Sequence, residues 1–329
     1  MTAPLLEVKQ LQTVFHTEAG AWPAVSDIHI TLQPGEILGL VGESGSGKSV
    51  TGFSIFGMID APGEITQGEV LFKGQDLRKL SPDAMRKLRG DRIAMIFQDP
   101  LMTLNPVLRI EEQMLEAIQA HQRMSRADAI QRCVEALAMV GIPAPEKRLR
   151  SYPHEFSGGM RQRVAIAIAM LNKPDLIICD EPTTALDVTI QGQILYRMQQ
   201  ICRENGTALI WITHDLGVIA ELADRVAVMY AGRIVETGTV SEVLDAPRHP
   251  YTLGLLQSLP ATATPGARLS QINGMAPSLS GRVPGCAFAP RCTRATVQCV
   301  SEQPAVTQVP GREFRCFVPL PTVSATSAA

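Results

Sequence analysis

The chain has 329 residues, of which 45% are hydrophobic and 19% are charged. This composition excludes a disordered chain and a coiled coil, and the length predicts roughly two domains that need no disulfides to stay folded. No run of 18 residues is apolar throughout, and the first residues, MTAPLLEVKQ, lack a signal-peptide pattern. We therefore expect a soluble, cytoplasmic chain without a transmembrane helix.

The net charge of −2 conceals two different segments. Residues 1–260 hold 24 Lys and Arg against 30 Asp and Glu, whereas residues 261–329 hold six Arg, no Lys and two Glu. The cysteines divide in the same way, with Cys133, Cys179 and Cys202 standing apart, and Cys286, Cys292, Cys299 and Cys316 crowded together. In a cytosolic chain such crowding indicates a metal or redox site.

The first elements of the chain are predicted strands. Alternating apolar residues predict strands within residues 6–15 and at 28–32. The run EILGLV at 36–41 predicts a buried strand, and a glycine-rich loop and an apolar segment of helical length follow it. Residues 68–80 predict a strand, a turn and a further short element, and IAMIFQ at 93–98 predicts another buried strand.

The middle of the chain carries helical patterns. Residues 110–122 predict one helix. Ser125 and Asp128 have the capping-box spacing of a second helix, which we expect to end at Gly141. Its predicted buried face consists of Ile130, Cys133, Val134 and Leu137. A third helix is expected to begin near Gly159 and to carry the apolar run VAIAIAML.

Strands return in the second half. Buried strands are predicted at 175–180 and at 208–214, with a helix at about 190–204 between them. A strand after each helix indicates parallel crossovers. Two shorter strands are expected within residues 226–238, and the run at 261–285, rich in Pro, Gly, Ser and Ala, predicts a linker.

The loop GESGSGKS at residues 42–49 matches the P-loop pattern GxxxxGK(S/T) between a strand and a helix. Its glycines allow backbone N–H groups to surround phosphates, and the following helix N-terminus favours negative charge. Lys48 is expected to neutralise the β- and γ-phosphates, and Ser49 to bind Mg²⁺. The other predicted nucleotide contacts are Gly42, Ser44, Gly45 and Gly47. Alone, this motif predicts nucleotide binding and nothing narrower.

The second part of the predicted nucleotide site lies at the end of the predicted strand LIICD. Asp180 at the strand end is suited to hold the Mg²⁺ shell, and Glu181 to orient or deprotonate the attacking water. Taken alone, the pair is more typical of an acidic helix start after a core strand. Upstream, Ser157, Gly158 and Gly159 precede an apolar helix and form another candidate anion site. One nucleotide does not need two such sites in one chain, so the second is expected to serve a neighbouring molecule.

This ordered set, with TALD at 184–187 and His214 at a strand end, resembles the ATP-binding-cassette (ABC) ATPases over about residues 5–245. The resemblance implies ATP and Mg²⁺ as cofactors. It implies that Gln98 touches Mg²⁺ and links the core to the helical segment, and that His214 contacts the γ-phosphate. It also implies that Asp187 lies in a loop crossing between two subunits. Phe15 is expected to stack on adenine, with Trp22 as the alternative.

The resemblance also implies the fold. We expect an α/β P-loop NTPase (RecA-like) core with an antiparallel β subdomain and an α-helical signature subdomain at about 100–165. The predicted ATP-binding domain spans residues 1–260, and a linker with a small Cys-rich extension spans 261–329.

The segment APRHPYTLGLLQSLP after residue 245, with QDPLMTLNP at 98–106 and YPHEFSGGM at 152–160, resembles oligopeptide and dipeptide importer ATPases. The resemblance implies an ATPase subunit that powers peptide import from the cytoplasmic face of the bacterial inner membrane. The implied partners are a second, related ATPase forming a heterodimer, two transmembrane permease subunits and an extracytoplasmic solute-binding protein.

The last four cysteines have the spacing C-x5-C-x6-C-x16-C. Zinc knuckles usually contain close C-x2–4-C pairs, and none occurs here, but spacing alone leaves zinc and iron–sulfur open. The importer resemblance implies a 4Fe–4S cluster held by Cys286, Cys292, Cys299 and Cys316. The three isolated cysteines are expected to be structural.

Two other functions compete with transport. A non-transport ABC ATPase could act on nucleic acid or the ribosome through the basic, Cys-rich tail, but such proteins typically carry two cassettes or a long coiled-coil insert, and this chain has neither. A non-hydrolysing relative is expected to have lost Glu181 or His214, and both are present. We therefore expect no nucleic-acid partner.

Overall fold

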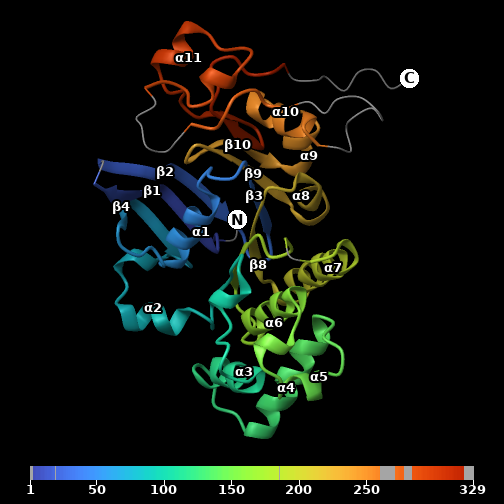
Figure 1. Ribbon diagram of the computed structural model, residues 1–329. Coiled ribbons are helices and arrows are strands. Elements are labelled where there is room, and N and C mark those ends of the chain that lie inside the picture. The colour runs from blue at the N-terminus through green and yellow to red at the C-terminus, as the bar shows by residue number, and fades with distance from the viewer. Residues whose placement is uncertain (1–2, 19, 185, 260–270, 278–283, 322–329) are drawn as a thin grey trace. The chain divides into compact units, whose positions relative to one another are not determined.

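The structure is a computed structural model (Figure 1) that describes residues 3–18, 20–184, 186–259, 271–277 and 284–321. The predicted boundary after residue 260 and most of the predicted linker at 261–285 lie outside the described residues, so that division of the chain stays a prediction. None of the described helices has both the length and the apolar character needed to cross a membrane.

The chain forms two compact units whose segments interleave in the sequence. The first unit comprises Met1–Leu6, Thr31–Ile37 and Leu71–Ile212, and the second unit comprises Glu7–Ile30, Leu38–Val70 and Thr213–Ala329. Each unit is described below by itself.

The first unit is built on three parallel strands, β6 (Ile93–Ile96), β7 (Leu176–Asp180) and β8 (Ala208–Thr213). Ile96 pairs with Cys179 and Asp180 pairs with Ile212 in the parallel ladders. All residues of the three strands are buried, as is typical of parallel strands covered on both faces. The carboxyl ends of β6 and β7 therefore lie side by side.

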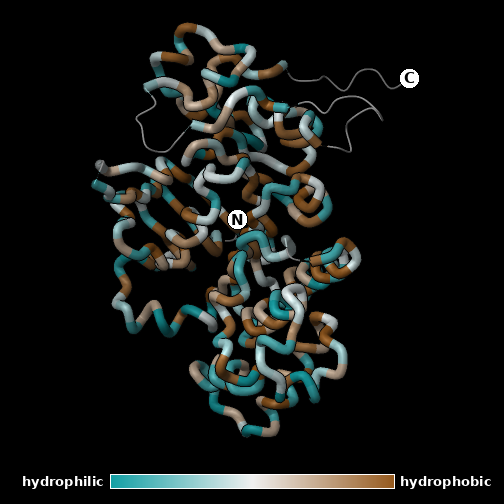
Figure 2. Tube along the Cα trace, viewed as in Figure 1, coloured by the Kyte–Doolittle hydropathy of each residue, from teal (hydrophilic) through white to brown (hydrophobic). Residues whose placement is uncertain are grey.

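Helices make up most of the rest of the first unit: α2 (Pro82–Leu88), α3 (Ile110–Gln119), α4 (Arg126–Met139), α5 (Pro145–Arg148), α6 (Gly158–Met170) and α7 (Val188–Asn205). Shorter elements are β5 (Gln75–Asp76), η1 (Leu77–Lys79), η2 (Pro100–Met102) and η3 (Pro153–Glu155). Hydrophobic and hydrophilic residues alternate along the helical segment (Figure 2), as amphipathic helices require.

Helix α4 begins as its sequence predicts. The hydroxyl of Ser125 accepts a hydrogen bond from the Asp128 amide, with 3.1 Å between Oγ and N. Its buried residues are Ala129, Cys133, Ala136 and Leu137, whereas Ile130 and Val134 are half-buried. The buried face of α4 is therefore rotated slightly from the predicted one. Its small alanines, rather than its β-branched residues, pack against the neighbouring helices.

The second unit contains two groups of strands. In one, β1 (Leu6–Thr17) lies between β2 (Gly20–Leu32) and β4 (Gly63–Phe72). In the other, β3 (Ile37–Val41) pairs in parallel with β9 (Arg225–Tyr230), and β9 pairs antiparallel with β10 (Arg233–Thr239). The helices of this part are α1 (Lys48–Phe56), α8 (Leu216–Leu222), α9 (Val240–Leu244) and α10 (Pro250–Gln257).

The C-terminal extension, here residues 284–321, adds η5 (Ala289–Arg291), α11 (Val297–Ser301), β11 (Thr307–Val309) and β12 (Arg312–Phe314) to the second unit. Strand β12 pairs antiparallel with β10, with Phe314 opposite Glu236. Arg312 donates to Glu236 at 3.0 Å, and this carboxylate is fully buried. The extension therefore continues the sheet of the second unit.

Candidate functional site

The P-loop lies in the second unit, between β3 and α1. Gly42 and Gly47 have positive φ angles of 155° and 103°. A Cβ atom at Gly42 would lie 2.2 Å from the Met229 carbonyl oxygen, and one at Gly47 would lie 2.8 Å from the Ala24 carbonyl oxygen. Only glycine fits at these two positions, because strand backbone packs directly against the loop.

The Lys48 side chain bonds to the backbone of its own loop. Its ammonium group donates to the carbonyl oxygens of Gly42 at 2.8 Å and Glu43 at 3.0 Å, and the residue is 5% exposed. These contacts hold a positive charge over a loop whose first helical turn carries unsatisfied N–H groups. The predicted loop contacts Gly42, Ser44, Gly45, Gly47, Lys48 and Ser49 thus form one local structure able to hold a polyphosphate.

The predicted acids lie in the first unit at the end of β7. Asp180 is 2% exposed, and Glu181 follows it with a positive φ of 45°. A non-glycine residue in this region carries strain that is common at functional sites. Gln98, which follows β6, donates from Nε2 to Glu181 Oε2 at 3.3 Å. The structure therefore brings together two of the predicted catalytic residues, Gln98 and Glu181.

The hydroxyl of Thr184 donates to the same Glu181 oxygen at 3.2 Å. This contact was not predicted from the sequence, although Thr184 begins the motif TALD. Two donors on one oxygen leave the orientation of the Glu181 carboxylate well defined.

Two predicted partner-facing residues begin helices in the first unit. The Ser157 hydroxyl accepts from the Met160 amide at 3.3 Å and caps α6. The Asp187 carboxylate accepts from the Ile190 amide at 3.0 Å and caps α7. Ser157, Gly158 and Asp187 are all exposed, and a Cβ at Gly158 would meet nothing within 4 Å. The open start of α6 is accessible to an anion.

The remaining nucleotide residues lie in the second unit. His214 is exposed directly after β8, where the next residue, Asp215, caps α8 through the Gly217 amide at 2.8 Å. Phe15 on β1 and Trp22 on β2 are half-buried. Which of the two rings stacks on adenine stays a prediction.

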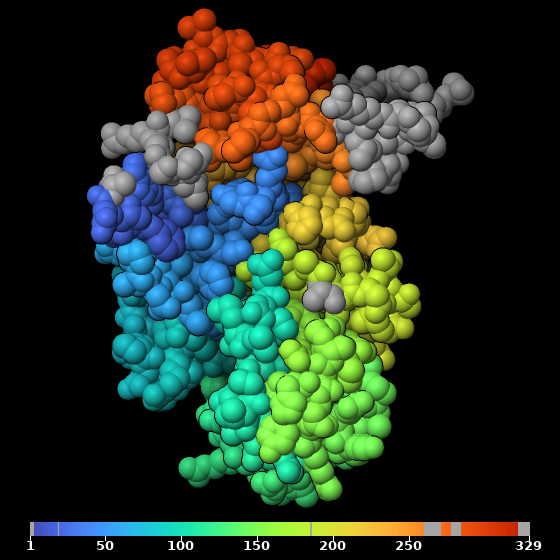
Figure 3. Space-filling model, viewed as in Figure 1, coloured from blue at the N-terminus to red at the C-terminus, as the bar shows by residue number. Residues whose placement is uncertain are grey.

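All four predicted cysteine ligands line one small pocket in the second unit, together with His249, Phe288 and Arg294. The extension that contains them packs against α10 (Figure 3). Among the described residues, no group of three or more His, Cys, Asp or Glu side chains is arranged to hold a single metal ion. The four thiols share one pocket, and the cluster that the resemblance implies stays a prediction.

Burial and backbone amides act in opposite directions on the pKa of these thiols. Burial raises the pKa of Cys286, Cys292 and Cys316, the last to about 11, while backbone amides oppose this by donating to the sulfurs. The Arg294 amide, for example, lies 3.4 Å from Cys292 Sγ. The amides offset only part of the effect of burial at these three sulfurs, and the net pKa of each thiol stays raised.

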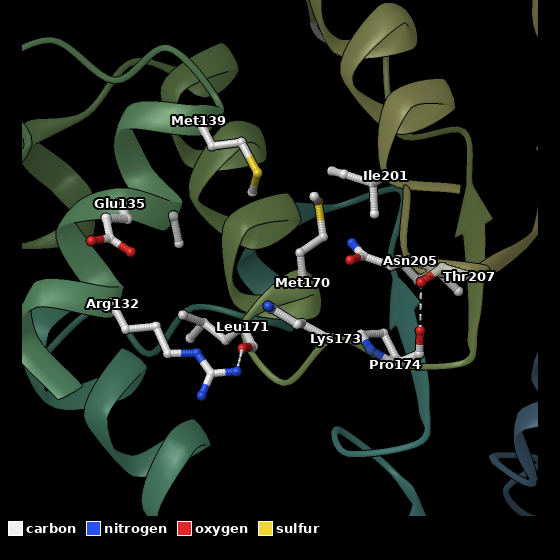
Figure 4. A pocket seen from close by; sticks show the side chains of 12 residues that line it. Arg132, Glu135, Met139, Met170, Leu171, Lys173, Pro174, Ile201, Asn205 and Thr207 are labelled. Carbon is white, nitrogen blue, oxygen red and sulfur yellow. Dashed lines mark hydrogen bonds between the residues drawn. The ribbon is translucent and has the colours of Figure 1, made fainter. Parts of the chain in front are cut away.

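Another pocket, of about 160 Å³, lies in the first unit between α4, α6, the start of β7 and the end of α7 (Figure 4). Its lining includes Met139, Met170 and Ile201, and beside it the Thr207 hydroxyl donates to the Pro174 carbonyl oxygen at 2.7 Å. It contains none of the predicted site residues and lies near the amino end of β7 rather than its acidic end.

Comparison with known proteins defines the class. Residues 25–184 match the ABC transporter family. The ATP-binding cassette MJ0796, solved as a dimer bound to ADP and Pi, superposes with a TM-score of 0.66 at 27% identity, covering 71% of this chain and 98% of that one. The protein cbiO1 from Clostridium perfringens, part of the transporter complex cbiONQ, gives a TM-score of 0.62 at 26% identity, covering 74% and 92%. The fold is that of an ABC ATPase, as the sequence predicts.

A second match identifies the branch of the ABC transporter family to which the chain belongs. Residues 235–299 match the C-terminal region of oligopeptide/dipeptide transporters. A Brucella abortus protein named for peptide import and ATP binding is 49% identical over 98% of this chain and 97% of its own length. A similarly named Brucella melitensis protein is 49% identical over 93% and 94%. The chain belongs to the ATP-binding subunits of ABC transporters with the oligopeptide/dipeptide C-terminal region, and its activity is ATP hydrolysis coupled to transport.

Proposed function

We propose that this chain powers the import of di- or oligopeptides through a membrane ABC transporter. The match of residues 235–299 to the oligopeptide/dipeptide C-terminal region carries this proposal, because it lies outside the nucleotide motifs shared by all cassettes. The relatives named for peptide import, which align over nearly the whole chain, support it. They favour transport over the alternative role on nucleic acid or the ribosome.

Within one chain, the P-loop binds the phosphates of ATP, Lys48 neutralises the β- and γ-phosphates, and Ser49 with Asp180 and Gln98 holds Mg²⁺. Glu181 orients and deprotonates the attacking water, and its bonds from Gln98 and Thr184 fix the oxygen that accepts the proton. His214 contacts the γ-phosphate, and Phe15 or Trp22 stacks on adenine.

The exposed start of α6 completes the site of a neighbouring ATPase. Ser157, Gly158 and Gly159 bind the γ-phosphate held by the P-loop of that neighbour, and Asp187 lies in the loop that crosses between the subunits. The open space beside Gly158 supports this role. A dimer, as in the MJ0796 structure, is required for turnover, and we propose a related second ATPase as the partner.

The other partners follow from the transport function. Two transmembrane permease subunits provide the path, and an extracytoplasmic solute-binding protein delivers the peptide. The chain works at the cytoplasmic face of the inner membrane as a peripheral subunit.

The four-cysteine pocket holds a 4Fe–4S cluster, with zinc as the alternative occupant. All four thiols line one pocket and backbone amides donate to three of the sulfurs, which supports this proposal. When bound, such a cluster supplies redox chemistry or structural cross-linking. ATP hydrolysis needs no electron transfer, and few of the described hydrophobic residues of the extension are buried, so a structural or redox-sensing role is favoured.

Uptake of peptide in the source bacterium tests the transport proposal. Deleting the gene should abolish uptake of a radiolabelled tripeptide while leaving uptake of a free amino acid intact. Wild-type chain should restore peptide uptake, and the Glu181→Gln variant should not. Undiminished uptake of di-, tri- and tetrapeptides, with loss of another solute such as nickel, would overturn peptide import and leave the ATPase assignment standing.

A further inference from the structure

The C-terminal extension makes a direct contact with the P-loop. The Arg291 guanidinium forms a two-pronged ion pair with Glu43, with Nη1 donating to Oε2 at 2.6 Å and Nη2 donating to Oε1 at 2.9 Å. Glu43 is the second residue of the P-loop, and both residues belong to the second unit. The Arg291 side chain is only 6% exposed and that of Glu43 is 30% exposed. Paired and shielded in this way, the contact is stronger than an ordinary surface ion pair.

A second contact holds the backbone of the same residue. The Glu43 amide donates to the hydroxyl oxygen of Tyr251 on α10 at 2.8 Å. Glu43 is thus fixed through its side chain by Arg291 and through its main chain by Tyr251. We call these three residues the Glu43 clamp.

Further contacts hold Arg291 and Tyr251 in place. Arg291 also donates from Nη1 to the Tyr230 hydroxyl at 3.3 Å and from Nε to the Asn273 carbonyl at 3.0 Å. The Tyr251 ring contacts those of Tyr230 and Phe288, with centroids 4.6 Å and 5.4 Å apart. Phe288 in turn lines the four-cysteine pocket. These contacts restrict both sides of the clamp, so its position is set by the folded extension.

The charge of Glu43 makes this contact important for nucleotide binding. A carboxylate in the P-loop lies close to where the motif holds phosphates, and an unpaired negative charge there opposes a triphosphate. Arg291 neutralises that charge, and Tyr251 fixes the adjacent amide and so limits the freedom the loop must lose when it binds. Arg291 also keeps its charge at any physiological pH.

We propose that Arg291 and Tyr251 are positioning residues for ATP, which makes the C-terminal extension a working part of the nucleotide site. They act through Glu43 and do not themselves touch the phosphates. This inference rests on the proposed nucleotide role of the P-loop and adds a determinant of ATP affinity that lies outside the cassette motifs.

The test measures the dissociation constant of Mg-ATP by calorimetry with the full chain. Arg291→Ala should raise it roughly 10- to 50-fold, as expected for loss of a charge-assisted pair. Tyr251→Phe, which removes only the hydroxyl, should raise it about 3- to 10-fold. Arg315→Ala is the matched control, because Arg315 also belongs to the extension and pairs at 2.6 Å with Asp27, a residue of β2 and not of the P-loop. It should change the constant less than about twofold.

The double variant Arg291→Ala/Glu43→Gln separates positioning from folding. It should bind ATP more tightly than Arg291→Ala alone, because the opposing carboxylate is gone. The Arg291→Ala defect should also shrink between about 50 mM and about 500 mM KCl, whereas the Tyr251→Phe defect should not. Circular dichroism confirms that each variant is folded.

Each outcome decides the inference. If wild-type chain binds no ATP, the proposed nucleotide function itself fails. If wild-type chain binds ATP and folded Arg291→Ala binds it equally well, only the clamp is overturned. Equal losses in Arg291→Ala and Arg315→Ala, or no recovery in the double variant, would also overturn the clamp, because they would indicate a general effect on the fold.

Discussion

The side-chain amide of Gln98 donates a hydrogen bond to the carboxylate of Glu181, with 3.3 Å between Nε2 and Oε2. The two residues lie 83 positions apart in the sequence. They meet because β6 and β7 are parallel neighbours, and Ile96 pairs with Cys179 near the ends of both strands. The contact joins the start of the helical segment to the proposed catalytic base.

Removing this contact should slow turnover. In the assembled transporter we expect Gln98→Ala to lower kcat roughly 10- to 150-fold, since a hydrogen bond to a charged group contributes roughly 1.5–3 kcal/mol. The Michaelis constant for ATP should change much less. Steady-state phosphate release measures both. Gln131→Ala, an exposed glutamine on α4 that bonds to Glu135, is the control, and a kcat equal to wild type in both variants would remove Gln98 from the mechanism.

The exposed start of α6 predicts a defect in the partner's site. Ser157→Arg should leave ATP binding by the isolated chain intact, because its own P-loop is unchanged. It should block hydrolysis at the P-loop of the adjoining subunit, where the arginine fills the space beside Gly158. Mixing tagged subunits and assigning the remaining activity to each P-loop measures this. Loss at the P-loop of the mutant chain itself, with the partner's site normal, would contradict the role in trans.

Local patterns predicted the elements that carry the nucleotide motifs. The P-loop, the acids after β7 and the Ser125 cap of α4 follow from short sequence signals, because loops, strand ends and helix starts depend mainly on adjacent residues. The fold and the family also followed from the order of these motifs. The buried face of α4 was less accurate, since the helices around it decide which of its residues are covered.

The Glu43 clamp could not be predicted from the sequence. Glu43 and Arg291 lie 248 positions apart, and no periodicity connects them. The available signals were an acidic residue inside the P-loop, a tyrosine in the segment RHPYT and an arginine next to Cys292. Only the packing of Phe288 against Tyr230 and Tyr251 shows that these positions meet.

The cysteine pocket predicts a coloured protein. Chain purified without oxygen should be brown and contain iron and acid-labile sulfide in comparable amounts. Alanine at Cys286, Cys292, Cys299 or Cys316 should bleach it and loosen the extension, because among its described hydrophobic residues only Phe288, Cys299 and Phe314 are buried. Absorption spectra and metal analysis measure this.

The other cysteines provide the control for that experiment. Cys133, Cys179 and Cys202 are buried in the first unit, so alanine at these positions should leave the colour unchanged. Colourless anaerobic protein with one zinc per chain would show that zinc, and not an iron–sulfur cluster, is bound by the four cysteines. Metal-free protein with an ordered extension would contradict both.

The buried His249, which caps α10, predicts a fold that loses stability in acid. Burial lowers its pKa from 6.5 to about 4, and its Nδ1 accepts from the Tyr251 amide at 3.0 Å. The unfolded chain therefore takes up a proton below pH 6.5 that the folded chain refuses until about pH 4. Over that interval the free energy of unfolding should fall by up to about 3 kcal/mol through this group.

Urea unfolding at several pH values tests the direction in which the free energy of unfolding changes with pH. The neighbouring Glu236 carboxylate, whose pKa burial raises, contributes in the opposite direction, so the informative quantity is the difference between variants. His249→Asn keeps an acceptor for the Tyr251 amide and should lose part of the decline, while His154→Asn, at an exposed site, should retain it. An identical decline in all three proteins would exclude His249 as the cause.

The most direct test of the account is ATP turnover by the assembled transporter with Glu181→Gln. Removal of a general base typically costs about 10² to 10⁴ in rate, so phosphate release should fall to that extent while Mg-ATP still binds and holds the two ATPase subunits together. Lys48→Ala, in contrast, should weaken ATP binding itself. Phosphate release by the Glu181→Gln complex at the wild-type rate would contradict the assignment of this chain's catalytic site.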